Sequence, residues 1–120
     1  MTIDYLKMDV EFSEWPALYD MIRTGLLQNV RQLVMEIHTP EMDIHTRPDH
    51  QCTWSTTETL AFMMRNLIDL KNLGFSLFYS RTNYRTSFRS VISGLERYCC
   101  YDLHFVNLKH PANVYQSHEF

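Results

Sequence analysis

A short strand that runs into acidic residues and then into a helix start constrains this 120-residue chain more than any other feature. The expected strand covers about Tyr5 to Val10, and Asp9 and Glu11 form its acidic end. Residues 13–16 then supply an N-cap serine and a proline in the first helical turn. This order is typical of a strand and its crossover helix in an open α/β sheet. Because the first strands of such a sheet would lie upstream, we expect the chain to hold only part of a fold.

The helix and the segment after it complete a βαβ unit. Apolar side chains recur along the helix at steps of three and four residues, which predicts one buried face. These residues are Trp15, Leu18, Tyr19, Ile22 and Leu26. Gly25 falls where a left-handed C-terminal cap is usual. Residues 30–38 have an apolar centre that is too short for a buried helix, so we predict a second strand, parallel to the first. The carboxyl ends of the two strands then share one edge.

The second half of the chain contains one further helix and two further strands. Residues 40–54 are polar and predict a long loop, and the capping-box pattern of residues 55–58 starts a helix of four to five turns that stops at Gly74. Residues 75–80 and 101–107 alternate large apolar with polar residues, as half-buried strands do, and we expect them to pair in antiparallel fashion. Residues 1–108 therefore form a partial domain, and residues 109–120 a loose tail.

Composition and charge exclude some classes of function. The net charge of −3, without a block of Lys or Arg, gives nucleic-acid binding no support. No apolar stretch approaches the roughly 20 residues that span a bilayer, and no targeting signal is visible, so the localisation stays open. The three cysteines cannot all pair, and Cys99 and Cys100 can join each other only through a strained ring. The redox compartment is therefore not predicted.

Two parts of the chain resemble a known family. Residues 4–11, followed by Ser13-Glu14-Trp15, resemble the fourth-strand motif of FkbM-type methyltransferase domains, where a Leu-Lys-Ile-Asp-Val-Glu-Gly pattern is usual. Residues 30–38 and 99–107 look like the animal branch of that family named after methyltransferase-like protein 24. The resemblance implies the C-terminal half of a Rossmann-like class I methyltransferase sheet. Such a half would contain two parallel strands with a crossover helix, then a helix and a closing antiparallel strand pair.

The resemblance also implies a cofactor and a reaction. An intact parent would transfer a methyl group from S-adenosylmethionine to an oxygen or nitrogen of a small-molecule or protein acceptor, and the secretory pathway fits such a parent. The glycine-rich first loop and the acidic end of the second strand, which hold the cofactor in the family, are absent here. Phe12 stands where the family usually has glycine. We therefore expect this chain alone not to bind the cofactor.

Four residues are the candidates for catalysis. Asp9 and Glu11 follow the first strand, Glu36 and His38 end the second, and all four are expected to face one cleft. A carboxylate or imidazole can take the proton of the attacking hydroxyl or amine, and carboxylates favour the cofactor's sulfonium. Asp9 is the residue expected to contact the cofactor. The structural alternative, capping of the following helix, is favoured for Glu11 and Glu14, and Glu36 and His38 stay open between the two.

Other chemistries receive less support. The possible metal ligands His38, Asp43, His45 and His50 match no known spacing, so we predict no metal site. A nucleophilic role for Cys99 or Cys100 is disfavoured, because adjacent strand residues point to opposite faces and at least one is expected in the core. A set of aromatic residues is assigned to the core, namely Trp54, Phe75, Phe78, Tyr79 and Phe105. Four arginines are assigned to a solvated face, namely Arg81, Arg85, Arg89 and Arg97.

A rival function belongs to another class of protein. The chain can be a truncated, catalytically inert fragment or a protein-interaction module. Truncation would leave a strand edge exposed, and such edges pair with other chains or with copies of themselves. On this interpretation we expect self-association through the edge and poor folding of the isolated chain.

Overall fold

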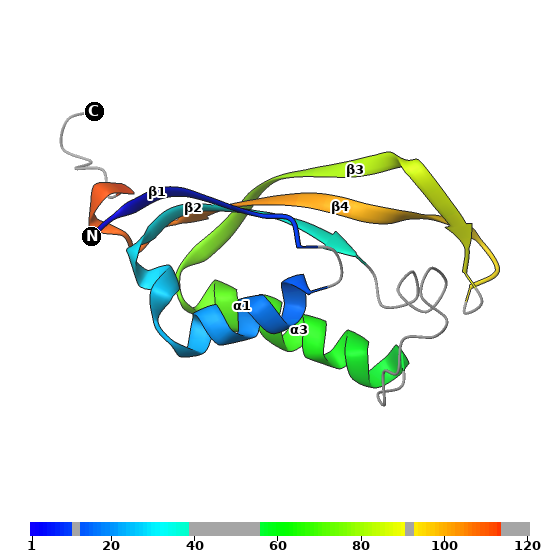
Figure 1. The fold of residues 1–120 in the computed structure, drawn as a ribbon, viewed down its shortest axis with the longest axis horizontal. Helices are drawn as coiled ribbons and strands as arrows, with labels where there is room; N and C mark the ends of the chain where they lie inside the picture. Colours follow the sequence, from blue (N-terminus) through cyan, green and yellow to red (C-terminus); the bar gives the residue numbers. More distant parts are fainter. Residues whose placement is uncertain (11–12, 39–55, 91–92, 114–120) are drawn as a thin grey trace.

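The computed structural model describes residues 1–10, 13–38, 56–90 and 93–113. Its elements, in chain order, are β1 (Ile3–Met8), α1 (Glu14–Arg23), the 3-10 turn η1 (Leu26–Asn29), β2 (Val30–His38), α3 (Thr56–Asn72), β3 (Phe75–Arg89), β4 (Glu96–Asn107) and the 3-10 turn η2 (Pro111–Asn113). Figure 1 shows these elements in space. The predicted loop of residues 40–54 and the capping residue Ser55 lie outside the described residues, as do Glu11 and Phe12.

The four strands form one mixed sheet in the order β1-β2-β4-β3. β1 and β2 are parallel, with Met8 opposite Met35 near their carboxyl ends. β4 runs antiparallel to both of its neighbours, β2 and β3. The predicted parallel pair and closing antiparallel pair are therefore confirmed. This α/β sheet is compatible with part of a Rossmann-like fold.

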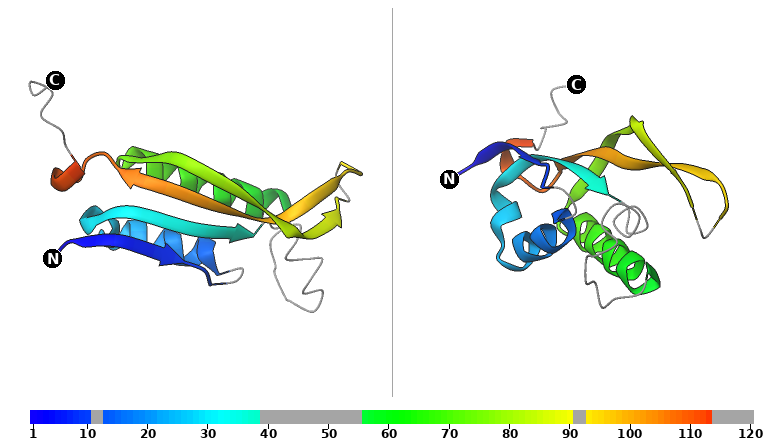
Figure 2. Two further views of the ribbon diagram at one scale, coloured as in Figure 1. Left: turned by 90° about the horizontal axis from the view of Figure 1, so that it is seen from above. Right: turned by 45° about the vertical axis from the view of Figure 1, so that its right-hand side comes forward.

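Both described helices lie on the same face of the sheet (Figures 1 and 2). The core fills the space between the two layers. Its fully buried apolar side chains come from both helices, η1 and β2, and include Leu18, Leu27, Leu33, Met35 and Leu70. No helix in the described ranges covers the opposite face, so that face can present polar side chains. No helix in these ranges is long and apolar enough to cross a membrane.

The first βαβ unit differs from prediction at its boundaries. β1 ends two residues before the predicted limit, Val10. α1 ends at Arg23, so Leu26 lies in η1 and is exposed rather than buried. Gly25 adopts the expected left-handed conformation, with φ of 76°. Ser13 occupies the N-cap position, but its side chain makes no capping hydrogen bond.

The hairpin of β3 and β4 is much longer than predicted. The segment between residues 80 and 101 is largely strand, and it includes the edge-on ring pair Tyr84 and Tyr98, 4.7 Å between centroids. Two register shifts interrupt the pairing, between Leu77 and Tyr79 and again between Asn83 and Ser87. Most of β3 beyond the core is exposed, so its sequence lacks the apolar alternation that identifies half-buried strands.

The start of the predicted tail is held against the sheet. Asn113 Oδ1 accepts from Arg31 Nε at 3.1 Å, and its Nδ2 donates to the carbonyl oxygens of Arg31 and Asn107 at 3.2 and 2.8 Å. His110 is buried. The expectation of a loose tail is therefore wrong for residues 109–113, because these polar side chains satisfy backbone groups at the sheet end. Residues 114–120 lie outside the described part.

Candidate functional site

Three of the four predicted site residues meet at the carboxyl edge of the parallel strands. Asp9 directly follows β1, and Glu36 and His38 end β2. The Asp9 carboxyl group is close enough to Glu36 to raise the pKa of Glu36, and His38 is close enough to lower it. Glu11, the fourth predicted residue, lies outside the described residues. The strand edge thus brings together two carboxyl groups and an imidazole.

The Glu36 carboxyl group holds its proton more tightly than an ordinary glutamate. Burial raises its pKa, and the hydrogen bond and negative charge of Asp9 raise it further. Asn83 Nδ2, 3.5 Å from Glu36 Oε1, and the nearby His38 act in the opposite direction. A carboxyl group with a raised pKa can donate or accept a proton near a bound ligand.

A buried glutamate orients His38. Glu14, the first residue of α1, has no exposed surface. Its Oε1 atom accepts from the backbone N-H of His38 at 2.7 Å and lies 2.8 Å from His38 Nδ1. Trp15 Nε1 donates to the carbonyl oxygen of His38 at 3.2 Å. Hydrogen bonds of the Glu14 and Trp15 side chains therefore hold the start of α1 against the end of β2.

The contact with Glu14 sets the chemistry of the imidazole. With Glu14 as the acceptor of the Nδ1 proton, neutral His38 carries its lone pair on Nε2. A carboxylate that holds one ring nitrogen fixes the tautomer and the orientation of the ring. Nε2 is consequently the ring nitrogen at which His38 would accept a proton.

The role of Glu14 was missed by the sequence analysis, which assigned it to capping. A signal was present, because Glu14 and Leu18 are four residues apart and share one face of the helix. Leu18 is fully buried, so Glu14 belongs to the buried face. A glutamate in an apolar helical stripe requires a polar partner, and the β2 end supplies it.

The two adjacent cysteines are joined by a disulfide bond, Cys99 to Cys100. Both are buried, together with Phe88. Cys100 lies directly opposite His38 in the pairing of β2 with β4. Possible ligand atoms of Glu36, His38 and Cys100 lie within 4.8 Å of one another. Asp43, His45 and His50, the other possible metal ligands named from the sequence, lie outside the described part of the chain.

The predicted aromatic core is only partly correct. Phe75 and Phe105 are buried in the core, whereas Phe78 and Tyr79 are exposed. Phe78 lies at the register shift between Leu77 and Tyr79, and the rings of Phe78 and Tyr79 meet His104 edge-on at 6.0 and 5.1 Å. Trp54 lies outside the described residues. The four arginines of β3 and β4 are exposed, as predicted.

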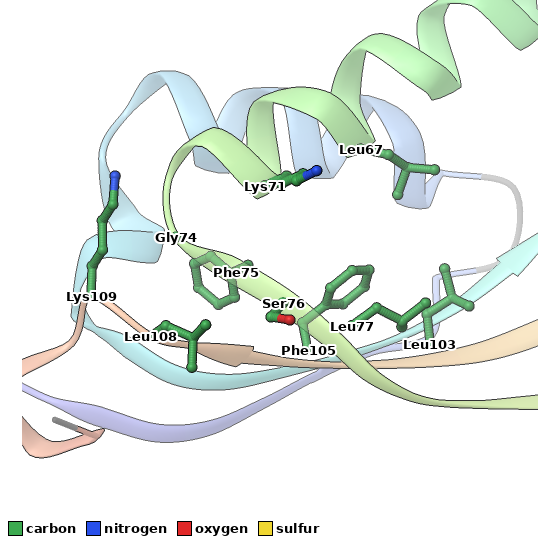
Figure 3. Close-up of a pocket in the computed structure, with 10 residues that line it drawn as sticks. All are labelled: Leu67, Lys71, Gly74, Phe75, Ser76, Leu77, Leu103, Phe105, Leu108 and Lys109. Atoms are coloured by element: carbon green, nitrogen blue, oxygen red, sulfur yellow. The ribbon is translucent and has the colours of Figure 1, made fainter. Parts of the chain in front are cut away.

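A separate apolar cavity of about 570 Å³ lies between the end of α3 and the sheet (Figure 3). Phe75, Leu77, Phe105 and Leu108 line it, with Lys71 at its margin. The cavity is distinct from the acidic edge, because Phe75 in its lining pairs with Asn107 at the end of β4, whereas His38 pairs with Cys100. Among the residues that the structure describes, none in its lining carries a carboxyl or imidazole group, whereas the strand edge carries both.

The fold is that of an α/β protein, and partial sequence similarity suggests a methyltransferase-like relationship. The chain is 33% identical over 78 residues to probable methyltransferase-like protein 24 of Homo sapiens, and 32% identical over the same length to that of Rattus norvegicus. These residues are 65% of this chain, which spans only 20% of each relative. No protein-family model matches the chain. No solved structure matches it either.

Proposed function

We propose that this chain is the C-terminal half of an FkbM-type, S-adenosylmethionine-dependent methyltransferase domain. The observation that carries the proposal is the meeting of Asp9, Glu36 and His38 at the carboxyl edge of two parallel strands, where open α/β sheets bind ligands. The partial similarity to two methyltransferase-like proteins supports the same class. The acceptor is an oxygen or nitrogen nucleophile.

The residues at the edge fit one side of a site for this cofactor. S-adenosylmethionine, when bound, supplies a methyl group on a positively charged sulfur. The Asp9 and Glu36 carboxyl groups offer negative charge to that cation, and Asp9 would contact the cofactor. The glycine-rich half of the site would come from outside this chain. The donor set here is therefore suitable but incomplete.

His38 is the proposed general base. An acceptor hydroxyl or amine that received the methyl group would have to lose a proton. His38 Nε2 would take that proton, and buried Glu14 would stabilise the resulting imidazolium. Glu36 would hold or exchange a proton with Asp9 beside it. Glu11 stays a proposed contact.

Titration of S-adenosylhomocysteine by calorimetry tests the proposal. The ligand is added to this chain and to the longest product of the same gene that contains it. We expect micromolar binding by the longer product, and at least tenfold weaker binding by its Asp9→Asn variant. The control is Asp4→Asn. Asp4 lies near the start of β1, away from the carboxyl ends of the strands, and forms an exposed ion pair with Arg31. Absence of binding by both products would overturn the proposal.

The rival role as an inert interaction module rests on β1. In the described sheet β1 pairs only with β2, so its outer edge has no strand beside it. An open edge of this kind can take up a strand of another chain or of a second copy. Sedimentation equilibrium of the isolated chain tests self-association. A monomer at tens of micromolar would count against this role.

A further inference from the structure

We infer that Glu36, His38 and Cys100 form a zinc site that becomes available when the Cys99–Cys100 disulfide is reduced. The three residues lie on two neighbouring strands, and His38 pairs directly with Cys100. Glu36 precedes His38 by two residues and so lies on the same face of β2. The inference concerns metal binding alone and does not depend on methyl transfer.

The separation of the ligand atoms is close to that of a zinc site. Their mutual distances are at most 4.8 Å. Zinc binds nitrogen and oxygen at about 2.0–2.2 Å and sulfur at about 2.3 Å, so tetrahedral ligands lie roughly 3.3–3.8 Å apart. A shift of about 1 Å, within the reach of side-chain rotation, closes the difference.

The partner of His38 is the kind that metal-bound histidines have. Histidines that bind metals through one ring nitrogen usually donate the other N-H to a carboxylate or a carbonyl oxygen. Buried Glu14 already lies 2.8 Å from His38 Nδ1, so coordination would use Nε2. Glu14 also accepts from the His38 backbone N-H, which fixes the end of the strand.

The carboxyl pair at the edge also favours a cation. Asp9 follows β1 and Glu36 lies near the end of β2, so a cation bound here would meet two neighbouring carboxyl groups. Asp9 or a water molecule would supply the fourth ligand.

The disulfide makes the site dependent on redox state. Exchange with a dithiol reductant transfers two electrons to the disulfide, giving two protein thiols and the oxidised, cyclic reductant. Cys100 Sγ then loses its proton as it binds the metal. A set of one sulfur, one nitrogen and carboxylate oxygen suits zinc, whereas calcium and magnesium take oxygen ligands.

Two matched variants of the full chain test the inference. Cys99→Ser and Cys100→Ser both remove the disulfide, keep Cys52 and keep one thiol of the pair, so they differ only in which sulfur of the pair remains. Zinc is titrated against a chromophoric chelator without reductant, and cobalt(II) reports sulfur ligation by its thiolate charge-transfer band. We expect one equivalent of zinc, at micromolar affinity or better, in Cys99→Ser, and at least 100-fold weaker binding in Cys100→Ser.

The wild-type chain should bind zinc only after treatment with a reductant that does not itself bind the metal. Circular dichroism of the metal-free variants establishes that both are folded, and His38→Gln in the Cys99→Ser background should lose the site. Equal zinc affinities of the two cysteine variants, or no binding by folded Cys99→Ser, would overturn the inference. Neither outcome bears on binding of S-adenosylhomocysteine by the longer product.

Discussion

Glu14 Oε1 accepts from the backbone N-H of His38 at 2.7 Å and lies 2.8 Å from its ring nitrogen Nδ1. One buried carboxylate thus joins the first residue of α1 to the last residue of β2 and orients the proposed base. Replacement by alanine should destabilise the chain by about 1–3 kcal/mol, because buried donors lose their acceptor. Glu14→Gln keeps an acceptor oxygen and should cost less. Urea unfolding measures both, and equal stability of Glu14→Ala and wild type would contradict the role.

The pH dependence of stability should contain a contribution from Glu36. Because its pKa is raised in the folded chain, the folded chain binds this proton more tightly than the unfolded chain. The stabilisation is complete below the ordinary pKa of 4.5 and is lost as the pH rises through the raised value. Glu36→Gln cannot ionise, so its stability should fall less between acidic and neutral pH.

Urea unfolding of wild type and Glu36→Gln across this pH range measures the difference. Glu96→Gln is the control for loss of a surface charge, since Glu96 is an exposed residue of β4. An equal fall in stability for wild type and Glu36→Gln would show that Glu36 ionises alike in both states.

Packing of α1 on the sheet should depend on Leu18. This side chain is fully buried in the core between the two layers. Leu18→Ala should cost about 2–5 kcal/mol, from lost apolar burial and the remaining cavity. Leu60→Ala, at a residue of α3 that is 41% exposed, should change stability by about 0.5 kcal/mol or less. Similar losses in the two variants, measured by urea unfolding, would argue against the observed layer arrangement.

The turn between α3 and β3 should require glycine at residue 74. Gly74 has φ of 108°, and an added Cβ would lie 2.6 Å from Cγ of Lys109. Displacing Lys109 would also break the hydrogen bond from its Nζ to the carbonyl oxygen of Asn72, 3.1 Å long. Gly74→Ala should therefore be destabilised by more than about 1 kcal/mol. Gly25 has φ of 76°, and an added Cβ there would have no atom within 4 Å. Gly25→Ala therefore has only the cost of the left-handed backbone conformation, so its melting temperature should fall less than that of Gly74→Ala.

The elements predicted correctly from the sequence are those whose pattern of apolar residues lies within the element itself. The 30–38 strand matches β2, and the helix predicted to stop at Gly74 ends at Asn72. The outer part of the β3–β4 hairpin was missed because its residues are largely exposed. Exposed strands need no alternation of apolar and polar residues, so the sequence carries no such pattern there. The anchoring by Asn113 was missed because it depends on contacts with Arg31, 82 residues away.

The residues of the candidate site also divide into those that the sequence predicts and those that only the fold reveals. Parallel pairing of two strands predicted that Asp9, Glu36 and His38 share one edge, since that follows from topology. The sequence could indicate that Glu14 is buried, but its partner His38 and the position of Cys100 follow only from the docking of α1 and the pairing of β2 with β4. Both depend on contacts between residues far apart in sequence.

The most direct test of the account is a nitrogen-15 NMR titration of S-adenosylhomocysteine into the longest gene product that contains this chain. The account predicts that amide shifts concentrate at Asp9 and at Glu36 to His38, and that the His38 Nε2 signal moves. Amides of Phe75 and Leu108, which line the apolar cavity, should stay unchanged. Shifts confined to residues that line the cavity would contradict a cofactor site at the strand edge. The absence of any shift at ligand concentrations that would saturate a micromolar site would contradict it as well.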